Sequence, residues 1–482
     1  MNLKAPASLL VLVVFMSLIV AYGSGCANPI APSGGPRDSL PPLLMAVMPK
    51  DSSENFDSKK VVFTFNEFVQ LDNVRENLIV SPVPKQDPTI ESKLRTVTIR
   101  IKDTLEPNTT YAYNFGNAIK DINEGNVLKN FTYVFSTGAY IDSLELTGKV
   151  LLAETGLADS TLIVMLHRNG DDSAVIKEKP RYYTKLDSTG NFHFRHLPAG
   201  VFYIYALKDE GGQRKYLSTR SLFGFADKPI TIGGKNQPVT LYAYVEKEDV
   251  KDKDKDKGKP KPGVGAKPTG AKPDKEKEKD KRLKFSINLE GGQQDLLSNM
   301  QMVFNDPLKR FDSSKVFFTN ETYKPIVNYR LQIDSTNKIV TLSYKWPENT
   351  AFNLIVDREF AEDSTGRKIP RTDTLHFRTK KESDYGNISI RFNNLDFSKH
   401  PVLQILQSGS LKDSARLTSK DFKVKIYKPG EYEMRILLDE NNNFVWDAGE
   451  FFGKHRQPEK VIAIKRKLVV KANWDNDYTI EL

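Results

Sequence analysis

Short runs of alternating apolar and polar residues constrain the fold of this chain more than any other feature. Residues 61–67, 96–101 and 339–344 each alternate with a period of two, as strands do when one face is buried. The 29 Gly and 26 Pro residues that punctuate the chain argue against long helices. The 27 Phe and 19 Tyr among 482 residues exclude a chain that buries nothing. The pattern predicts an all-β protein made of tandem β-sandwich modules.

A charged spacer divides the chain into two similar halves. Residues 246–283 are rich in Lys, Asp, Glu and Pro and contain no aromatic residue. A basic patch for nucleic acid or phospholipid is the alternative, but charges of both signs alternate here and no ring is available to stack on a base. We therefore predict a disordered, solvated spacer and no nucleic-acid partner.

The first module of each half carries the same series of motifs. Residues 43–138 contain Pro49-Lys50-Asp51, the strand-like run 61–67, the segment 105–111, a turn from Asp121 to Gly125, and a final run 131–137. This order resembles the bacterial Ig-like domains of S-layer and other envelope proteins. Residues 284–380 match in outline, with Phe352 where the family has Tyr. In such sandwiches the Tyr hydroxyl can bond back to the backbone, so the second copy is expected to be more diverged.

The second module of each half has a different signature. Residues 187–206 read DSTGNFHFRHLPAGVFYIYA, with Gly at the turns and alternating aromatic residues. This is similar to transthyretin-like or carboxypeptidase-regulatory-like domains, and residues 422–436 keep the same frame. We predict transthyretin-like sandwiches over 143–245 and 385–482. The chain is thus expected to repeat an Ig-like plus transthyretin-like pair twice.

The amino end has the features of a targeting segment. Lys4 is followed by an apolar run over 9–21 and by the only cysteine, Cys26, which follows small residues. This resembles a lipobox, with Gly23 where Leu is usual; a secreted protein with an accidental cysteine is the alternative. We predict a lipoprotein signal peptide over 1–25, lipidation at Cys26 and a Pro/Gly tether over 26–42. The expected location is the bacterial outer membrane, and the sequence leaves open the periplasmic or the surface leaflet.

One loop has the oxygen spacing of a calcium site. Residues 439–450 place ligand types at EF-hand intervals, with three carboxylates and one backbone carbonyl. Phe444 stands where such loops need Gly, and the flanks are strand-like, so a polar hairpin loop is the alternative. The candidate calcium ligands are Asp439, Asn441, Asn443, Val445, Asp447 and Glu450.

Asp-Ser/Thr followed by Ala, Leu or Thr recurs more often than composition explains. The triplet resembles the O-glycosylation sequon of one large phylum of Gram-negative envelope proteins, whereas ordinary Asp-Ser/Thr turn chemistry is the alternative. The candidate acceptors are Ser39, Thr104, Ser143, Ser160, Ser173, Ser188, Ser335, Ser364, Thr374 and Ser414.

The sequence contains no nucleophile elbow, zinc-protease motif or phosphate loop. We therefore expect that the chain is not an enzyme, and calcium is the one cofactor that the sequence suggests. The predicted function is a non-catalytic, lipid-anchored envelope scaffold or protein-interaction module, as an accessory subunit of an outer-membrane complex. A glycan-binding or adhesive surface lipoprotein is the alternative, and a hydrolase in an unrecognised module is a third hypothesis.

Overall fold

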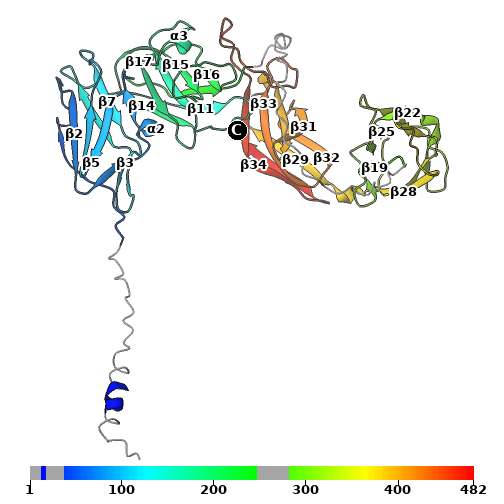
Figure 1. The fold of residues 1–482 in the computed structure, drawn as a ribbon. Helices are drawn as coiled ribbons and strands as arrows, with labels where there is room; N and C mark the ends of the chain where they lie inside the picture. Colours follow the sequence, from blue (N-terminus) through cyan, green and yellow to red (C-terminus); the bar gives the residue numbers. More distant parts are fainter. Residues whose placement is uncertain (1–11, 18–36, 247–281) are drawn as a thin grey trace, which may run out of the picture. The chain divides into compact units, whose positions relative to one another are not determined.

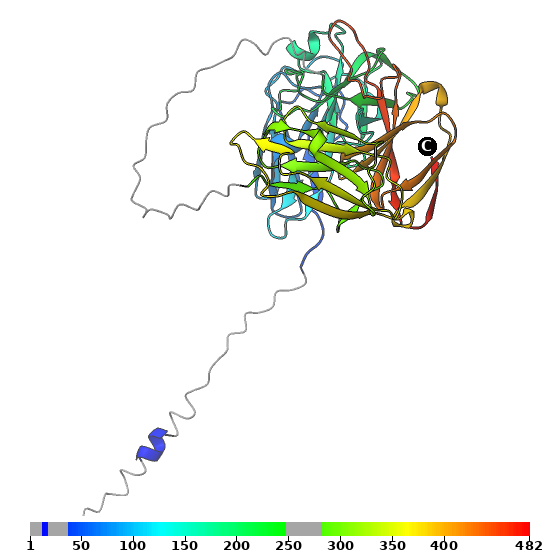
Figure 2. The same ribbon diagram turned by 90° about the vertical axis from the view of Figure 1, so that its right-hand side faces the viewer.

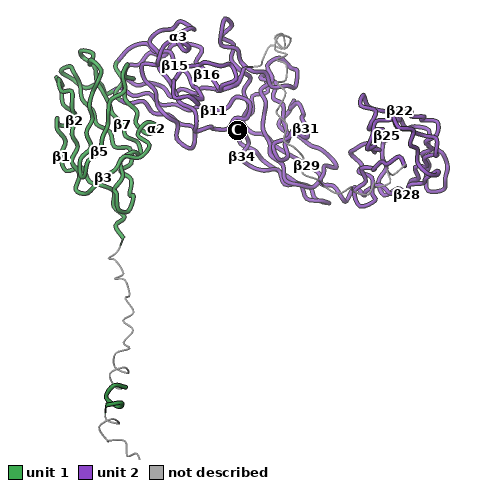
Figure 3. Tube along the Cα trace, viewed as in Figure 1, with its two compact units in different colours: residues 1–143, 196–198 green, residues 144–195, 199–482 purple. Residues whose placement is uncertain are grey.

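The computed structural model describes residues 12–17, 37–246 and 282–482 as two compact units. One unit holds residues 1–143 and 196–198, and the other holds 144–195 and 199–482 (Figure 3). Figures 1 and 2 show strands in separate sheets with only short helices, which confirms the all-β prediction. Within the described ranges no helix has the length and apolarity needed to cross a membrane. Cys26 and most of the predicted spacer lie outside the described residues.

The first unit contains one sandwich, which we call the first sandwich. A short helix, α2 (Val74–Asn77), precedes β4. Its three sheets have the orders β1(Leu44–Met48)-β2(Lys60–Phe65)-β6(Thr96–Arg100)-β5(Thr89–Lys93), β10(Thr132–Ser136)-β7(Thr110–Asn114)-β4(Ile79–Ser81) and β3(Val69–Leu71)-β8(Ile119–Asp121)-β9(Val127–Leu128).

Aromatic side chains fill the first sandwich. On β2 every second residue, Val61, Phe63 and Phe65, is buried, which confirms the predicted alternation. Phe63 meets Tyr133 edge-on, with ring centroids 5.3 Å apart. Such contacts between rings from different sheets supply most of the buried area of a small sandwich.

The third sandwich, in the second unit, repeats this strand order. Its sheets are β19(Phe285–Ile287)-β21(Met300–Phe304)-β25(Ile339–Ser343)-β24(Arg330–Ile333), β20(Gln293–Gln294)-β28(Asp373–Thr379)-β26(Ala351–Val356)-β23(Val316–Asn320) and β22(Leu308–Phe311)-β27(Ala361–Asp363). A 3-10 helix, Ser313–Lys315, precedes β23. The repeated order shows that the first and third sandwiches share one architecture, as the sequence motifs predicted.

One predicted difference between the two copies is compensated. The Tyr111 hydroxyl accepts the backbone N–H of Glu106 at 2.8 Å, as expected for this corner. At the matching positions of the third sandwich, Phe352 has no hydroxyl and Pro347 has no N–H. The missing acceptor therefore leaves no unpaired donor, and buried Phe352 packs among Phe318, Trp346 and Phe377 instead.

The second and fourth sandwiches also share one topology. The sheets of the second are β14(Asn191–Leu197)-β11(Leu144–Leu152)-β18(Val239–Ala243) and β13(Tyr182–Lys185)-β12(Ile163–His167)-β15(Gly200–Leu207)-β16(Phe223–Phe225), with β17(Ile230–Ile232) also pairing with β15. The sheets of the fourth are β32(Asp421–Tyr427)-β29(Gly386–Asn393)-β35(Asp475–Glu481) and β31(Ser410–Arg416)-β30(Pro401–Gln407)-β33(Gly430–Leu438)-β34(Lys460–Val470). Residues 12–17 also form a short helix, and the other short helices are α3(Ala174–Lys177), Glu382–Asp384 and Phe397–Lys399.

A parallel strand pair marks both of these sandwiches. β11 pairs with β18, and β29 pairs with β35, in the same direction. The other strand pairs given for these two sandwiches are antiparallel. The same exception in both copies supports a repeat, while the transthyretin-like resemblance and the domain boundaries stay predictions.

Asp363, the last residue of β27, should contribute to the free energy of unfolding in a way that depends on acid pH. Burial raises the pKa of Asp363, but the Arg367 N–H, the Thr365 hydroxyl and the Arg367 guanidinium lower it to about 2, from an ordinary value of 3.8. A carboxylate whose folded pKa is depressed stabilises the fold above its unfolded pKa. We expect this contribution to disappear as the pH falls from about 4 to about 2.

The test compares urea midpoints across this pH range. Asp363→Asn should show a shallower loss of stability than the wild type between pH 4 and pH 2. The control is Asp373→Asn, because this side chain is exposed. Urea midpoints that fall equally with pH in the wild type and in Asp363→Asn would contradict a depressed pKa at Asp363.

Candidate functional site: a docking arm and a polar joint

Residues 439–459, which we call the docking arm, connect β33 to β34 and include the predicted calcium loop. At the base, the fully buried Asp439 carboxylate accepts the N–H groups of Asn443 and Phe444, each at 3.0 Å. The same carboxylate pairs with the Arg416 guanidinium at 2.9 Å. A buried charge needs such partners, and here they shape the turn.

The other predicted calcium ligands have protein partners as well. Asp447 Oδ2 accepts the side-chain amides of Asn441 and Asn443, each at 2.7 Å, and the Glu450 carboxylate pairs with Lys454 at 2.9 Å. The Val445 N–H donates to Asn443 Oδ1 at 2.6 Å. Asp439, Asn441, Asn443 and Asp447 thus form one network, and Glu450 pairs with Lys454. In the described part of the chain, no three His, Cys, Asp or Glu side chains are grouped as metal ligands would be.

Calcium binding stays a prediction, and Asp439 provides its test. Asp439→Ala should lower the free energy of unfolding by about 2–4 kcal/mol even in chelator, because it leaves two N–H groups and a guanidinium without their acceptor. A bound ion would add about 2.7 kcal/mol at hundredfold excess over its dissociation constant. Asp439→Ala should abolish this gain.

The matched control is Asp209, which follows β15 as Asp439 follows β33. Its carboxylate accepts the N–H groups of Gln213 and Arg214 at 3.0 and 2.9 Å. Asp209→Ala should leave any calcium dependence of the melting temperature unchanged. Equal melting temperatures of the wild type in calcium and in chelator would leave only the polar hairpin loop.

A second buried carboxylate closes the base of the arm. Glu459 accepts the N–H groups of Glu440 and Asp447, both at 3.0 Å, and its carbonyl accepts the Trp446 indole N–H at 2.7 Å. Burial raises the pKa of Glu459. Nothing in the sequence near Glu459 distinguishes it from a surface Glu, so its burial was not predictable from the local pattern.

The tip of the arm inserts an aromatic ring into the second sandwich. Phe451 is 2 % exposed, and its ring centroid lies 5.0 Å from Phe223, 5.1 Å from Phe225 and 5.8 Å from Tyr205. The next residue, Phe452, stacks on Tyr216. The adjacent pair of Phe residues in a polar loop is the one sequence signal that could have identified this contact.

Polar contacts surround the inserted ring. The Gln457 amide donates to the Phe225 carbonyl at 3.0 Å and to Asp227 at 2.7 Å, and His455 Nε2 lies 2.7 Å from Asp172. The Phe451 N–H donates to Glu246 at 3.2 Å. An apolar centre with a polar rim is the usual anatomy of a specific protein interface.

The backbones of the two sandwiches also come close. The Val461 N–H donates to the Ala153 carbonyl at 3.0 Å. A Cβ on Gly449 would lie 2.5 Å from the Tyr244 ring, so only glycine fits there. The second and fourth sandwiches, separated in sequence by the spacer and the third sandwich, therefore pack directly on each other.

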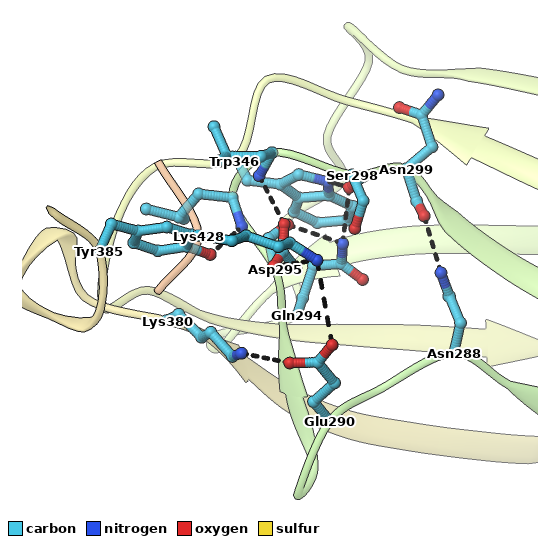
Figure 4. Close-up of polar contacts among 12 residues, drawn as sticks. Asn288, Glu290, Gln294, Asp295, Ser298, Asn299, Trp346, Lys380, Tyr385 and Lys428 are labelled. Carbon is cyan, nitrogen blue, oxygen red and sulfur yellow. Dashed lines mark hydrogen bonds and ion pairs between the residues drawn. The ribbon is translucent and has the colours of Figure 1, made fainter. Parts of the chain in front are cut away.

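A second joint links the third and fourth sandwiches through polar groups (Figure 4). Lys428 pairs with the nearly buried Asp295 at 2.9 Å, and the Tyr385 hydroxyl accepts the Leu296 N–H at 2.8 Å. Burial raises the pKa of Asp295, but Lys428 and the Leu297 N–H lower it overall. Glu290 pairs with Lys380 and lies 3.9 Å from Lys428. We call this group the Lys428 joint.

The candidate glycosylation sites lie mainly at the surface. Eight of the ten acceptors are exposed, and Ser173 and Thr374 are half-buried. Asp187 and Asp363 accept N–H groups from their own turns, so turn chemistry accounts for these two triplets. Modification of the set stays a prediction.

We expect the ten acceptors to carry glycans in the native host. Replacing the eight exposed residues by Ala should lower the intact mass by the mass of the sugars, whereas replacing the same number of exposed Ser and Thr outside the triplet should not. Equal masses, after correction for the substitutions, would exclude glycosylation.

Comparison with known proteins identifies a class for the first sandwich. Residues 38–137 match the family model described as the bacterial Ig-like domain. This agrees with the resemblance predicted for 43–138. No curated protein sequence matches the chain.

Solved structures show only distant similarity. The Bacillus anthracis TIE protein is 12 % identical over 98 % of this chain and 78 % of its own, with a TM-score of 0.17. BcpA, the major pilin subunit of Bacillus cereus, is 10 % identical over 70 % and 99 %, with a TM-score of 0.17. The S-layer protein rSbsC(31-844) is 12 % identical over 82 % and 52 %, with a TM-score of 0.15. Such low scores carry no information about function.

Proposed function

We propose that the chain is a non-catalytic, lipid-anchored scaffold of the cell envelope that presents its sandwiches to a partner protein as an accessory subunit of an outer-membrane complex. The bacterial Ig-like match and the series of β-sandwiches support the class. The lipobox-like segment ending at Cys26 supports the anchor. The proposal thus includes both an envelope protein partner and lipid attachment at Cys26.

The observation that carries the proposal is the insertion of Phe451 into the second sandwich. Tandem sandwiches on a flexible chain would move independently, since interfaces between domains are usually small and polar. Here an arm of the fourth sandwich buries an aromatic ring among three others. The Lys428 joint holds the third sandwich to the fourth. The chain thus uses its buried contacts to fix sandwiches together, as a scaffold requires.

The glycan-binding alternative has less support. Sugar-binding surfaces commonly present neighbouring exposed rings. Tyr140, Tyr323 and Trp474 are well exposed, but within the described residues none of them contacts another aromatic ring. Isolated rings of this kind are ordinary on a surface of this size.

Affinity isolation from native membranes tests the proposal. A carboxy-terminally tagged chain should recover an envelope protein in constant ratio after mild cross-linking. The Cys26→Ser chain, expressed at the same level, should recover less of it because it no longer lies at the membrane. Recovery of the tagged chain alone would contradict the accessory-subunit role.

A further inference from the structure

Five exposed apolar side chains gather at one end of the first sandwich. We call this group the end patch, and it comprises Leu40, Leu43, Phe68, Leu94 and Ile122, with exposed fractions of 69, 63, 44, 64 and 50 %. They come from four segments that are distant in sequence. Scattered apolar residues are normal on a surface, whereas a group from several loops at one end marks a contact site.

Backbone hydrogen bonds place these segments side by side. The Asn66 N–H donates to the Leu43 carbonyl at 3.0 Å, the Val69 N–H to Leu94 at 2.9 Å, and the Ile122 N–H to Phe68 at 3.1 Å. Figure 1 shows β3, which follows Phe68, near the end where the chain enters the sandwich. Residues 37 and 38 lie at the same end, because Arg37 donates to the Glu124 carbonyl and the Asn126 amide donates to the Asp38 carbonyl.

The length of chain before this end indicates what covers it. Cys26 lies only 11 residues before Arg37 in the sequence. Eleven residues reach at most about 40 Å when fully extended. If acyl chains hold Cys26 in a bilayer, this end is the part of the sandwich nearest to the lipid.

The charges of this end fit a lipid surface without a strong net charge. Arg37, Lys93 and Arg95 lie near the patch, together with the acidic residues Asp38, Glu67, Asp121 and Glu124. The acidic groups outnumber the basic ones by one, so electrostatic attraction to anionic lipid does not drive the contact. Apolar side chains at the headgroup–acyl boundary supply the remaining driving force.

We propose that the end patch of the first sandwich contacts the lipid surface, with Leu40, Leu43, Phe68, Leu94 and Ile122 entering the headgroup–acyl boundary. This deepens the proposed function, since it rests on attachment at Cys26. The contact orients the first sandwich against the membrane instead of leaving it to tumble on its tether. Residues on the opposite end, such as Tyr140, stay in water.

The test uses residues 26–482 coupled through the Cys26 thiol to a maleimide phospholipid in phosphatidylethanolamine-rich vesicles. Cys26 is the only cysteine, so the coupling is unique. Leu94→Trp places a fluorescent reporter in the patch, and Tyr140→Trp places one at the opposite end. The three native Trp residues give the same background in both proteins.

Brominated acyl chains should quench at least half of the emission added by Leu94→Trp and almost none of that added by Tyr140→Trp. Replacing Leu40 and Phe68 by Ser in the Leu94→Trp protein should reduce the quenching several-fold. Equal, weak quenching at both positions would overturn the proposal. Chemical coupling makes this result independent of lipidation in the cell, so failure here and failure of the Cys26 anchor are distinguishable.

Discussion

Phe451→Ala should lower the free energy of unfolding of the second and fourth sandwiches by about 3–5 kcal/mol. The substitution removes a buried ring and leaves a cavity among Tyr205, Phe223 and Phe225, whose rings hold their positions in β15 and β16. Urea denaturation followed by tryptophan fluorescence measures the loss, because Trp446 lies in the same arm. The arm should also become sensitive to limited proteolysis between residues 448 and 458.

Phe444→Ala is the matched control, since Phe444 belongs to the same arm but is 42 % exposed. Its ring contacts the Arg416 guanidinium at 4.4 Å, a cation–π contact that contributes about 0.5–1 kcal/mol at an exposed site. Similar losses for the two variants would show that the tip of the arm is not docked on the second sandwich. Unchanged proteolysis of the Phe451→Ala arm would lead to the same conclusion.

Cys26→Ser should move the protein from the membrane fraction to the soluble fraction. The thiol is the only one in the chain, so the substitution removes the proposed site of lipid attachment completely. Two or more acyl chains hold a protein stably on a bilayer, whereas a few apolar surface side chains such as the end patch bind lipid only weakly. Carbonate-washed membranes and intact mass spectrometry together measure attachment and lipid.

Ser33→Ala, in the same predicted tether, should stay with the membrane and keep the lipid mass. Membrane retention of the Cys26→Ser protein after the carbonate wash would contradict anchoring through this residue alone. A wild-type mass equal to that of the unmodified polypeptide would contradict lipidation itself.

Local sequence determined the parts of this protein that depend on neighbouring residues. The alternation in 61–67 predicted β2 because a strand buries every second side chain, and Val61, Phe63 and Phe65 are buried. The resemblance of 43–138 to bacterial Ig-like domains implied the corner bond of Tyr111, whose donor, the Glu106 N–H, is only five residues away. The carboxylates of 439–450 are also close in sequence, and their spacing predicted a calcium loop. In the structure Asp439 holds backbone N–H groups and a guanidinium.

Only the tertiary structure decided which distant groups meet. Phe451 and Phe225 are 226 residues apart, and no pattern near either residue specifies the other. The burial of Glu459 and of Asp295 likewise depends on packing between segments that are distant in sequence. Burial raises the pKa of Glu459, whereas the hydrogen bonds and charges around Asp295 lower its pKa despite burial. The end patch exists only because four loops end together. Periodicity is a property of one strand, whereas an interface is set by the three-dimensional arrangement of many strands, and for that reason it is absent from any short stretch of sequence.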